Sequence, residues 1–176
     1  MNSTMKMITA AILTTLFAGY ANAAADNVNI QITGKVIASP CTTVNGGQNP
    51  LTVSLGNDIS TSSLQPAGSN STWVDFDLAL TGCPTGTNNV KATFTGSPDA
   101  VDGTRWANTA ASKALNTSVE LREQVTNVLL SNGSMLTTSV ASNKATFKLK
   151  TAAYSSQGNA TPGDISTVIL ASFIYQ

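Results

Sequence analysis

Apolar and polar residues alternate in short runs along much of this chain, and that period of two most constrains its fold. The clearest run places four aliphatic residues and a glycine at every second position: Val28, Ile30, Ile32, Gly34 and Val36. Successive side chains of a β-strand point to opposite faces, so such a run gives one apolar and one polar face. Beyond residue 23, no helical period of 3.6 lasts more than about two turns. The chain is therefore predicted to be all-β.

Similar runs predict further strands at residues 51–55, 74–80, 90–95, 115–122, 128–130, 144–150 and 167–175. An Asn132-Gly133 pair follows residues 128–130, and this dipeptide is the strongest short-range signal for a β-hairpin. The connections are rich in Ser, Gly, Asn and Pro, and the longest covers residues 96–113. About seven or eight short strands separated by such turns are typical of an antiparallel β-sandwich.

The N-terminus has the pattern of a signal peptide. Lys6 precedes a short apolar run, and Ala21 and Ala23 supply the small residues that signal peptidase reads. We expect residues 1–23 to be removed, which leaves a mature chain of residues 24–176. This length suits one domain, and no second apolar stretch is long enough for a membrane helix. The protein is predicted to be exported.

Export gives a meaning to the two cysteines, Cys41 and Cys83. In an oxidising compartment, two cysteines in one domain most simply form one structural disulfide. Closing the loop between them would stabilise the fold by about 4 kcal/mol on the loop-entropy model. Two cysteines without a histidine cannot complete a zinc site within one chain, so no metal site is expected.

Charge and composition exclude several classes of function. The chain has 9 basic and 9 acidic side chains and no histidine. Its basic residues are scattered, which argues against nucleic-acid binding. Without histidine, the usual general base near neutral pH is missing, so no enzyme activity, cofactor or small-molecule substrate is expected. Asp75 and Asp77 share one face of a strand and are interpreted as solvated surface rather than as a catalytic carboxylate pair.

The alternating run at residues 28–36 begins close to the predicted cleavage site. Pro40 follows it and interrupts any ladder of strand hydrogen bonds, so the segment is separable from the rest of the domain. It could therefore pair with another chain. The alternative is an ordinary first strand of the sandwich, and periodicity alone favours that alternative.

Three blocks of sequence resemble one known family. Residues 34–41, with the alternating residues 28–33 before them, resemble the N-terminal extension and first cysteine of chaperone-usher pilins, in particular the minor tip subunits of type 1 fimbriae. Residues 71–84, followed by residues 90–96, resemble the segment around the second cysteine of that family. Residues 173–176 resemble its C-terminal strand with a penultimate tyrosine. The resemblance spans nearly the whole mature chain.

The resemblance implies an incomplete immunoglobulin-like β-sandwich that a strand from another chain completes. A signal peptide (1–23) would precede a donor-strand extension (24–39) and a pilin domain (40–176). The side chains of the donor strand would enter a neighbour's groove, and Gly34 would let the strand lie close to a bulky pocket. The implied donor-strand positions are Val28, Ile30, Ile32, Gly34 and Val36. The implied partners are a periplasmic pilus chaperone, an outer-membrane usher and neighbouring pilin subunits.

The C-terminal run, residues 167–175, would border the acceptor groove. One alternate set of side chains is preferred as the lining of the groove: Ile169, Ala171, Phe173 and Tyr175. The other set stays open: Val168, Leu170, Ser172 and Ile174. The resemblance also implies that the carboxylate of Gln176 is where the chaperone anchors the subunit.

The predicted function is that of a structural subunit of a chaperone-usher fimbria that supports cell adhesion at the cell surface. A minor or adaptor subunit is the preferred reading. A two-domain tip adhesin is not expected, because the mature length leaves no room for a receptor-binding domain. A major shaft pilin is the first alternative. A stand-alone secreted carbohydrate-binding or adhesin β-sandwich is the second.

Overall fold

The computed structural model describes residues 28–176 of the chain. The predicted signal peptide, residues 1–23, and the first part of the predicted extension, residues 24–27, lie outside the described residues. The chain divides into two units, Met1–Lys35 and Val36–Gln176. No helix among the described residues is long and apolar enough to cross a membrane.

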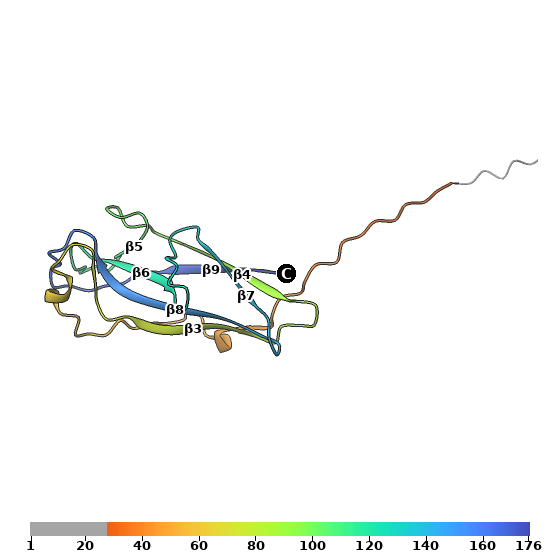
Figure 1. Ribbon diagram of the computed structural model, residues 1–176, viewed down its shortest axis with the longest axis horizontal. Coiled ribbons are helices and arrows are strands. Elements are labelled where there is room, and N and C mark those ends of the chain that lie inside the picture. Colours follow the sequence, from red (N-terminus) through yellow and green to blue (C-terminus); the bar gives the residue numbers. More distant parts are fainter. Residues whose placement is uncertain (1–27) are drawn as a thin grey trace, which may run out of the picture. The chain divides into compact units, whose positions relative to one another are not determined.

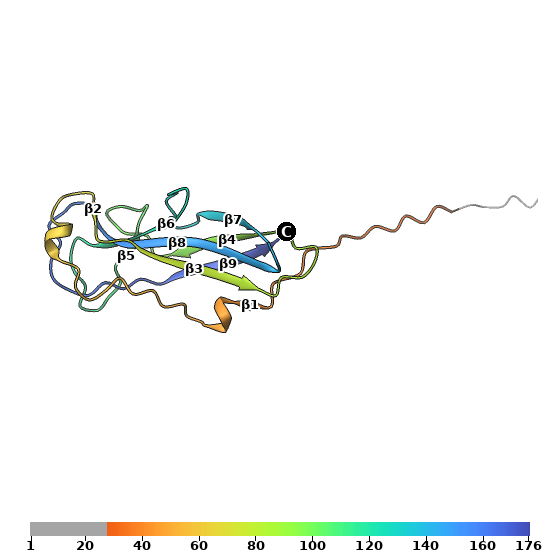
Figure 2. The ribbon, with the colours of Figure 1, turned by 60° about the horizontal axis from the view of Figure 1, so that its bottom comes forward.

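The unit Val36–Gln176 is built from two antiparallel sheets (Figures 1 and 2). The larger sheet has the order β1-β3-β8-β6-β5, with β2 also paired to β8, and the smaller has the order β7-β4-β9. The strands of the described residues are β1 (Thr43–Val44), β2 (Ser69–Asn70), β3 (Val74–Thr81), β4 (Asn89–Gly96), β5 (Trp106–Ala107), β6 (Ser118–Glu123), β7 (Met135–Ser139), β8 (Lys144–Ser155) and β9 (Ile169–Tyr175). Two short 3₁₀ helices, η1 (Asn45–Gly47) and η2 (Thr61–Leu64), complete them. The predicted all-β sandwich is confirmed.

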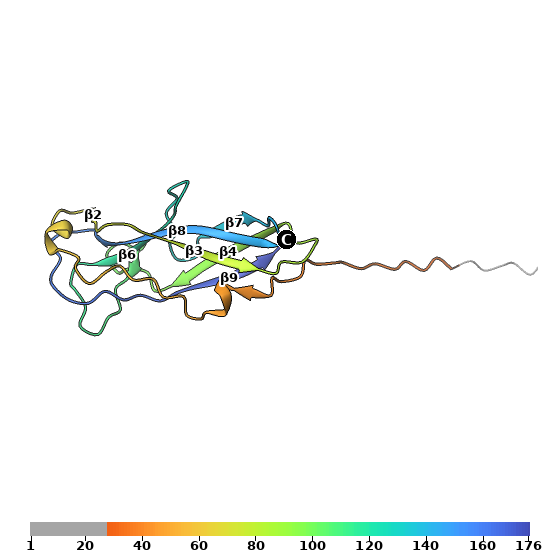
Figure 3. The same ribbon diagram turned by 90° about the horizontal axis from the view of Figure 1, so that it is seen from below.

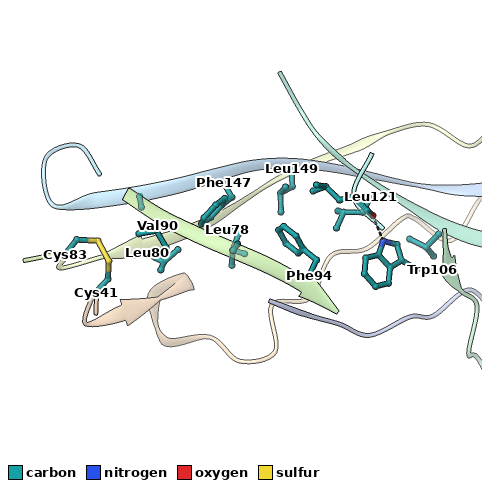
Figure 4. Close-up of a cluster of buried hydrophobic side chains, with 14 residues drawn as sticks. Cys41, Leu78, Leu80, Cys83, Val90, Phe94, Trp106, Leu121, Phe147 and Leu149 are labelled. Carbon is teal, nitrogen blue, oxygen red and sulfur yellow. Dashed lines mark hydrogen bonds between the residues drawn. A yellow bond between two sulfur atoms is a disulfide. The ribbon is translucent and has the colours of Figure 1, made fainter. Parts of the chain in front are cut away.

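The core lies between the two sheets (Figure 4). The larger sheet contributes Leu80 of β3 and Phe147 of β8, and the smaller sheet contributes Val90 of β4, all at most 1% exposed. These are inward-facing members of the alternating runs that predicted the strands. Trp106 of β5 is fully buried, and its indole Nε1 donates a hydrogen bond to the carbonyl oxygen of Leu130 at 2.9 Å. Period-two alternation therefore has its physical cause in this shared core.

The predicted disulfide lies at the end of the core opposite Trp106 (Figure 4). The Sγ atoms of Cys41 and Cys83 are bonded at 2.06 Å, and the two residues are 7% and 1% exposed. The bond joins the segment that precedes β1 to the residues that follow β3. It therefore closes the sandwich at the point where the N-terminal segment enters it.

Two predicted strands are extended but pair with nothing in the described part of the chain. In residues 51–55, Leu51, Val53 and Leu55 are half-buried while Thr52 and Ser54 are exposed, so the alternation survives without a strand. Residues 28–36 also form no strand. Strand pairing requires backbone groups of a neighbour, and alternation reports only which face meets the core. The prediction of ordinary strands at these two places is wrong for the isolated chain.

The hairpin predicted at the Asn132-Gly133 pair is also wrong. The pair lies in a turn that is closed by a hydrogen bond from the Ser134 N–H to the Ser131 carbonyl oxygen at 2.9 Å. The strand that follows, β7, pairs with β4 rather than with residues 128–130. The turn signal was correct, but it carries no information about which strand the next one joins. Short strands β2 and β5, and the mixed polar sequence of β7, had no long alternation to predict them.

Two strand boundaries differ from the prediction for local reasons. Strand β6 begins at Ser118 rather than at residue 115, because Asn116 has a φ of 57°, a left-handed conformation that a strand cannot include. Strand β8 continues to Ser155, beyond the predicted end at residue 150. Its last residues, 151–155, are buried on both faces except Tyr154, so they show no polar alternation.

A buried charged cluster covers the outer face of β6 and β8. Glu120 is 1% exposed, and its carboxylate accepts hydrogen bonds from Nε of Arg105 and from Nδ2 of Asn70, each at 3.0 Å. Nε of Arg122 donates to the other carboxylate oxygen. The Arg105 guanidinium also lies 4.3 Å from the ring centroid of Tyr154. The long side chain of Arg105, from the loop before β5, covers this face.

Candidate strand-pairing site

Strand β9 is an edge strand of the smaller sheet (Figure 3). It pairs with β4 along its whole length, from Ile169 opposite Gly96 to Tyr175 opposite Val90. Among the described residues, its other edge pairs with no strand. One row of backbone N–H and C=O groups is therefore free to pair with a strand from elsewhere.

The sequence of β9 lacks the devices that normally protect an edge. It contains no charged residue, no proline and no glycine, and its register with β4 has no bulge. Proteins usually place Lys, Pro or a bulge at such an edge because an open apolar edge recruits other strands. An unprotected edge of this length is therefore a candidate binding site for a strand.

The inward face of β9 is apolar and only half-buried. Four side chains pack against the core from this face, and the structure places the preferred groove set here: Ile169, Ala171, Phe173 and Tyr175. The neighbouring strand β4 buries its own inward residues almost completely, with Val90 and Ala92 both at 0% exposure. The difference arises because β4 has a strand on each side and β9 has one. Burial nevertheless raises the pKa of Tyr175.

The outward face of β9 carries the other alternate set. Leu170 and Ile174 are 62% and 52% exposed, and Val168, just before the strand, is 80% exposed. Sequence reasoning had left the choice between the two sets open because both are largely apolar. Packing against the core separates them, because only the first set faces the core.

Residues 51–55 supply a second unpaired border of the same core. Leu51 and Leu55 pack against the core cluster that also receives the inward side chains of β9. Neither this stretch nor the free edge of β9 is hydrogen-bonded to a strand at that side. Sequence reasoning missed this stretch as a site element, although its alternation was the available signal. The core-facing side chains of both stretches are therefore only partly buried.

The alternating N-terminal segment is extended and exposed. Its aliphatic side chains are 81% to 99% exposed: Val28, Ile30, Ile32 and Val36. A Cβ added to Gly34 would meet no atom within 4 Å, so nothing in this chain explains a glycine there. An apolar row of this kind is costly to leave in water, since burying each side chain contributes about 1.5 to 3 kcal/mol.

The two ends of the unit Val36–Gln176 meet at the loop between β3 and β4. The Thr87 hydroxyl donates to the carbonyl oxygen of Ser39 at 2.9 Å. The backbone N–H groups of Asn88 and Asn89 donate to the carbonyl oxygen of Gln176 at 2.6 and 2.9 Å. This loop was not identified from the sequence, which contains no signal that would have marked it.

No chemistry beyond pairing is evident at this site. Among residues 28–176, no group of three or more potential metal ligands lies together. The free edge offers backbone hydrogen bonds, and the half-buried side chains offer apolar contact. Such a surface suits the addition of an extended peptide strand, in which main-chain bonds give affinity and alternate side chains give specificity.

No family model matches the chain, but individual fimbrial proteins are similar to it in sequence. The chain is 40% identical over 154 residues to the S-fimbrial adhesin protein SfaS of Escherichia coli, and the alignment covers 88% of each chain. It is 37% identical over 153 residues to the protein FimG of Escherichia coli, which covers 86% of each. It is 36% identical over 154 residues to the fimbrial-like protein YdeR of the same organism, over 86% of this chain and 87% of that one.

Solved structures of low sequence identity share the fold. The P pilus rod subunit PapA superposes with a TM-score of 0.63 at 19% identity, over 78% of this chain and 100% of PapA. A chain from the structure of a chaperone-usher pilus gives a TM-score of 0.63 at 20% identity, over 86% of this chain and 96% of that one. The two-sheet architecture is thus found in other proteins.

Proposed function

The chain belongs to the chaperone-usher pilin family of fimbrial proteins, and from that premise we propose that it joins a fimbria by giving one strand and accepting another. The accepted strand pairs with the free edge of β9. The donated strand is the segment around residues 28–36. The observation that carries the proposal is the free, uncharged edge of β9, whose inward side chains are only half-buried. The same chain also has an exposed row of aliphatic side chains at residues 28–36.

The acceptor half of the proposal rests on β9 and residues 51–55. A strand placed between them would bond to the free backbone groups of β9 and cover the inward side chains, which we propose as the groove lining: Ile169, Ala171, Phe173 and Tyr175. A register slip by one residue would turn every donor side chain to the wrong face. The alternation of the incoming strand therefore sets its position.

The donor half rests on the exposed residues of the N-terminal segment. Val28, Ile30, Ile32 and Val36 would enter a neighbour's groove, and together they give a gross burial of roughly 6 to 12 kcal/mol before ordering costs. We assign residues 24–39 to this extension and residues 40–176 to the pilin domain. Gly34 would lie where the neighbour's groove leaves no space for a side chain.

The same edge explains the proposed route of assembly. A subunit with an uncovered β9 would aggregate, so a periplasmic chaperone would cover the edge first and the outer-membrane usher would exchange it for the next extension. The Gln176 carboxylate, at the end of β9, is the proposed anchor for that chaperone. The fimbria would then carry the chain to the cell surface, where it supports adhesion without acting as an enzyme.

We place the chain at a minor or adaptor position. The alignments with SfaS and FimG over 86–88% of each chain support this, and it has one sandwich together with an extension of its own. A major shaft pilin differs in copy number rather than in fold, so quantifying the chain in purified fimbriae separates the two. One copy per fibre supports an adaptor, and many copies support a shaft subunit.

Deletion of residues 24–39 tests the proposal. The truncated chain should fold, accept a strand and stop fibre growth at its own position, because it cannot donate. Fibres of normal length would show that the segment is not a donor. Loss of folding would show that the segment is an internal strand, as a stand-alone secreted sandwich would require. Substitution of outward-facing Asn29 by Ser serves as the control that leaves the apolar row intact.

A further inference from the structure

The root of the N-terminal extension is fixed by a single buried side chain. Thr87 is 4% exposed, and its hydroxyl bonds to the Ser39 carbonyl oxygen across 48 positions of sequence. The same loop holds the last residue of the chain through Asn88 and Asn89. One loop thus contacts both the last residue of the donor segment, Ser39, and the residue that follows the acceptor strand, Gln176.

The fixed part of the chain begins sharply at Ser39. After it, the ring of Pro40 restricts one backbone dihedral, and Cys41 is held by its disulfide. Before it, Val36 and Ile37 are 99% and 74% exposed. No hydrogen bond anchors residues 36–38 to the rest of the described chain.

The Thr87 hydroxyl is not needed to shape its own loop. The backbone N–H of Thr87 already closes the turn by donating to the Pro84 carbonyl oxygen at 3.2 Å. Ser39 is exposed, so water could replace the bond to its carbonyl without leaving a buried polar group. What the hydroxyl specifically adds is a fixed direction for the chain where it leaves the domain.

We propose that Thr87 is a positioning residue that sets the stiffness of the joint between this subunit and the neighbour that takes its strand. The inference rests on the proposed strand donation. With Val36 held in the neighbour and Ser39 held by Thr87, only Ile37 and Ala38 lie free between two folded bodies. Each free residue adds two soft dihedrals. Releasing Ser39 lengthens the free linker by half.

The first test is nuclear magnetic resonance of the full mature chain kept folded by its chaperone, and this measurement does not depend on assembly into fimbriae. The Ser39 amide should have an order parameter of about 0.85, typical of rigid backbone, and the Thr87→Val variant should lower it below about 0.6. Thr87→Ser keeps the hydroxyl and should restore rigidity. Thr85→Val, an exposed position of the same loop, is the matched control and should change nothing.

The second test measures the joint itself in electron micrographs of purified fimbriae. Thr87→Val should widen the spread of angles between this subunit and its acceptor by about 1.2-fold, since the spread grows as the square root of the number of free residues. An order parameter of Ser39 that is unchanged in Thr87→Val, or that falls equally in Thr85→Val, would show that the Thr87 hydroxyl does not fix Ser39. A lowered order parameter of Ser39 with an unchanged spread of angles between the subunits would show that Thr87 does not set the stiffness of the joint. Absence of the wild-type chain from fimbriae overturns strand donation instead, and the magnetic-resonance result still decides whether Thr87 fixes Ser39.

Discussion

Phe173 on the edge strand β9 packs against Phe147 on β8, with ring centroids 6.1 Å apart and planes inclined by 35°. Phe147 is 1% exposed, whereas Phe173 is half-buried. The pair links the strand with a free edge to the opposite sheet, so the side chain that anchors β9 in the free subunit also lies on the face that a donor strand would cover.

Replacement of Phe173 by Ala should therefore act twice. We expect the free energy of unfolding to fall by about 2 kcal/mol, less than for a fully buried phenylalanine because the ring is partly exposed. Strand acceptance should fall as well, because a donor loses its largest contact. Urea denaturation and incorporation into fimbriae measure the two effects. Ile174→Ala, on the outward face, should change stability by no more than about 0.5 kcal/mol; equal effects in both variants would contradict the assignment of faces.

Replacement of Gly34 by Leu should separate folding from assembly. A side chain at position 34 meets nothing within 4 Å in the free chain, so thermal stability should be unchanged. In a neighbour's groove the same side chain would clash, and strand exchange should slow by at least about tenfold, equivalent to about 1.4 kcal/mol. Mixing purified donor with chaperone-bound acceptor measures the rate. Thr33→Val, which faces out, is the control, and normal exchange by Gly34→Leu would remove Gly34 from the mechanism.

Replacement of Glu120 by Gln should destabilise the domain without touching the strand-pairing site. Arg105 would lose the carboxylate 3.0 Å away and keep a largely buried charge. Breaking a buried ion pair in this way typically costs about 3 to 5 kcal/mol. Asp75→Asn, on an exposed strand position, should stay within about 0.5 kcal/mol. Chemical denaturation distinguishes them, and equal stability of the two variants would show that the cluster is not important for folding.

Between pH 2 and 8, stability should depend on pH only in acid. A hydrogen bond from the Thr104 hydroxyl lowers the pKa of Asp102. Burial would raise the pKa of Glu123, but hydrogen bonds from the Thr126 side chain and backbone outweigh it and lower that pKa. A lowered folded pKa stabilises the fold above the ordinary carboxyl pKa of about 4, and this contribution is lost as pH falls through the folded pKa.

Between pH 6 and 8 the unfolding free energy should stay flat, because the chain has no histidine. Thermal melts at pH 2 to 8 check both statements. The paired variants Thr104→Val and Thr126→Val should each lower stability at pH 7 and lessen the loss in acid. A stability that rises on acidification below pH 4 would contradict the sign.

Much of the fold could be predicted from the alternation of apolar and polar residues, because this pattern indicates a strand with one buried face. It located β3, β4 and β9 to within two residues. It did not distinguish residues 51–55 from a paired strand, since the partner's backbone lies outside the local sequence. The ion pair of Glu120 could not be predicted for a related reason, because Arg105 reaches it from a separate loop.

In the candidate site, too, local sequence predicted some features, whereas others depend on contacts between distant residues. The exposed apolar row could be read from residues 28–36, because the two faces of this segment differ in polarity. The inward set of β9 could not, because Phe173 and Ile174 are both apolar and only packing against Phe147 separates their faces. Thr87 was not predictable at all, since its role depends on a hydrogen bond to Ser39.

Hydrogen–deuterium exchange of the β9 amides is the most direct test of strand acceptance. In the free chain, the N–H groups that bond to β4 should exchange slowly and those on the free edge should exchange rapidly. In assembled fimbriae, the free-edge amides of Ile169–Tyr175 should become as protected as those of β4, because carbonyl oxygens of the donor strand now accept hydrogen bonds from them. Free-edge amides that exchange as rapidly in the fimbria as in the isolated chain would contradict the account.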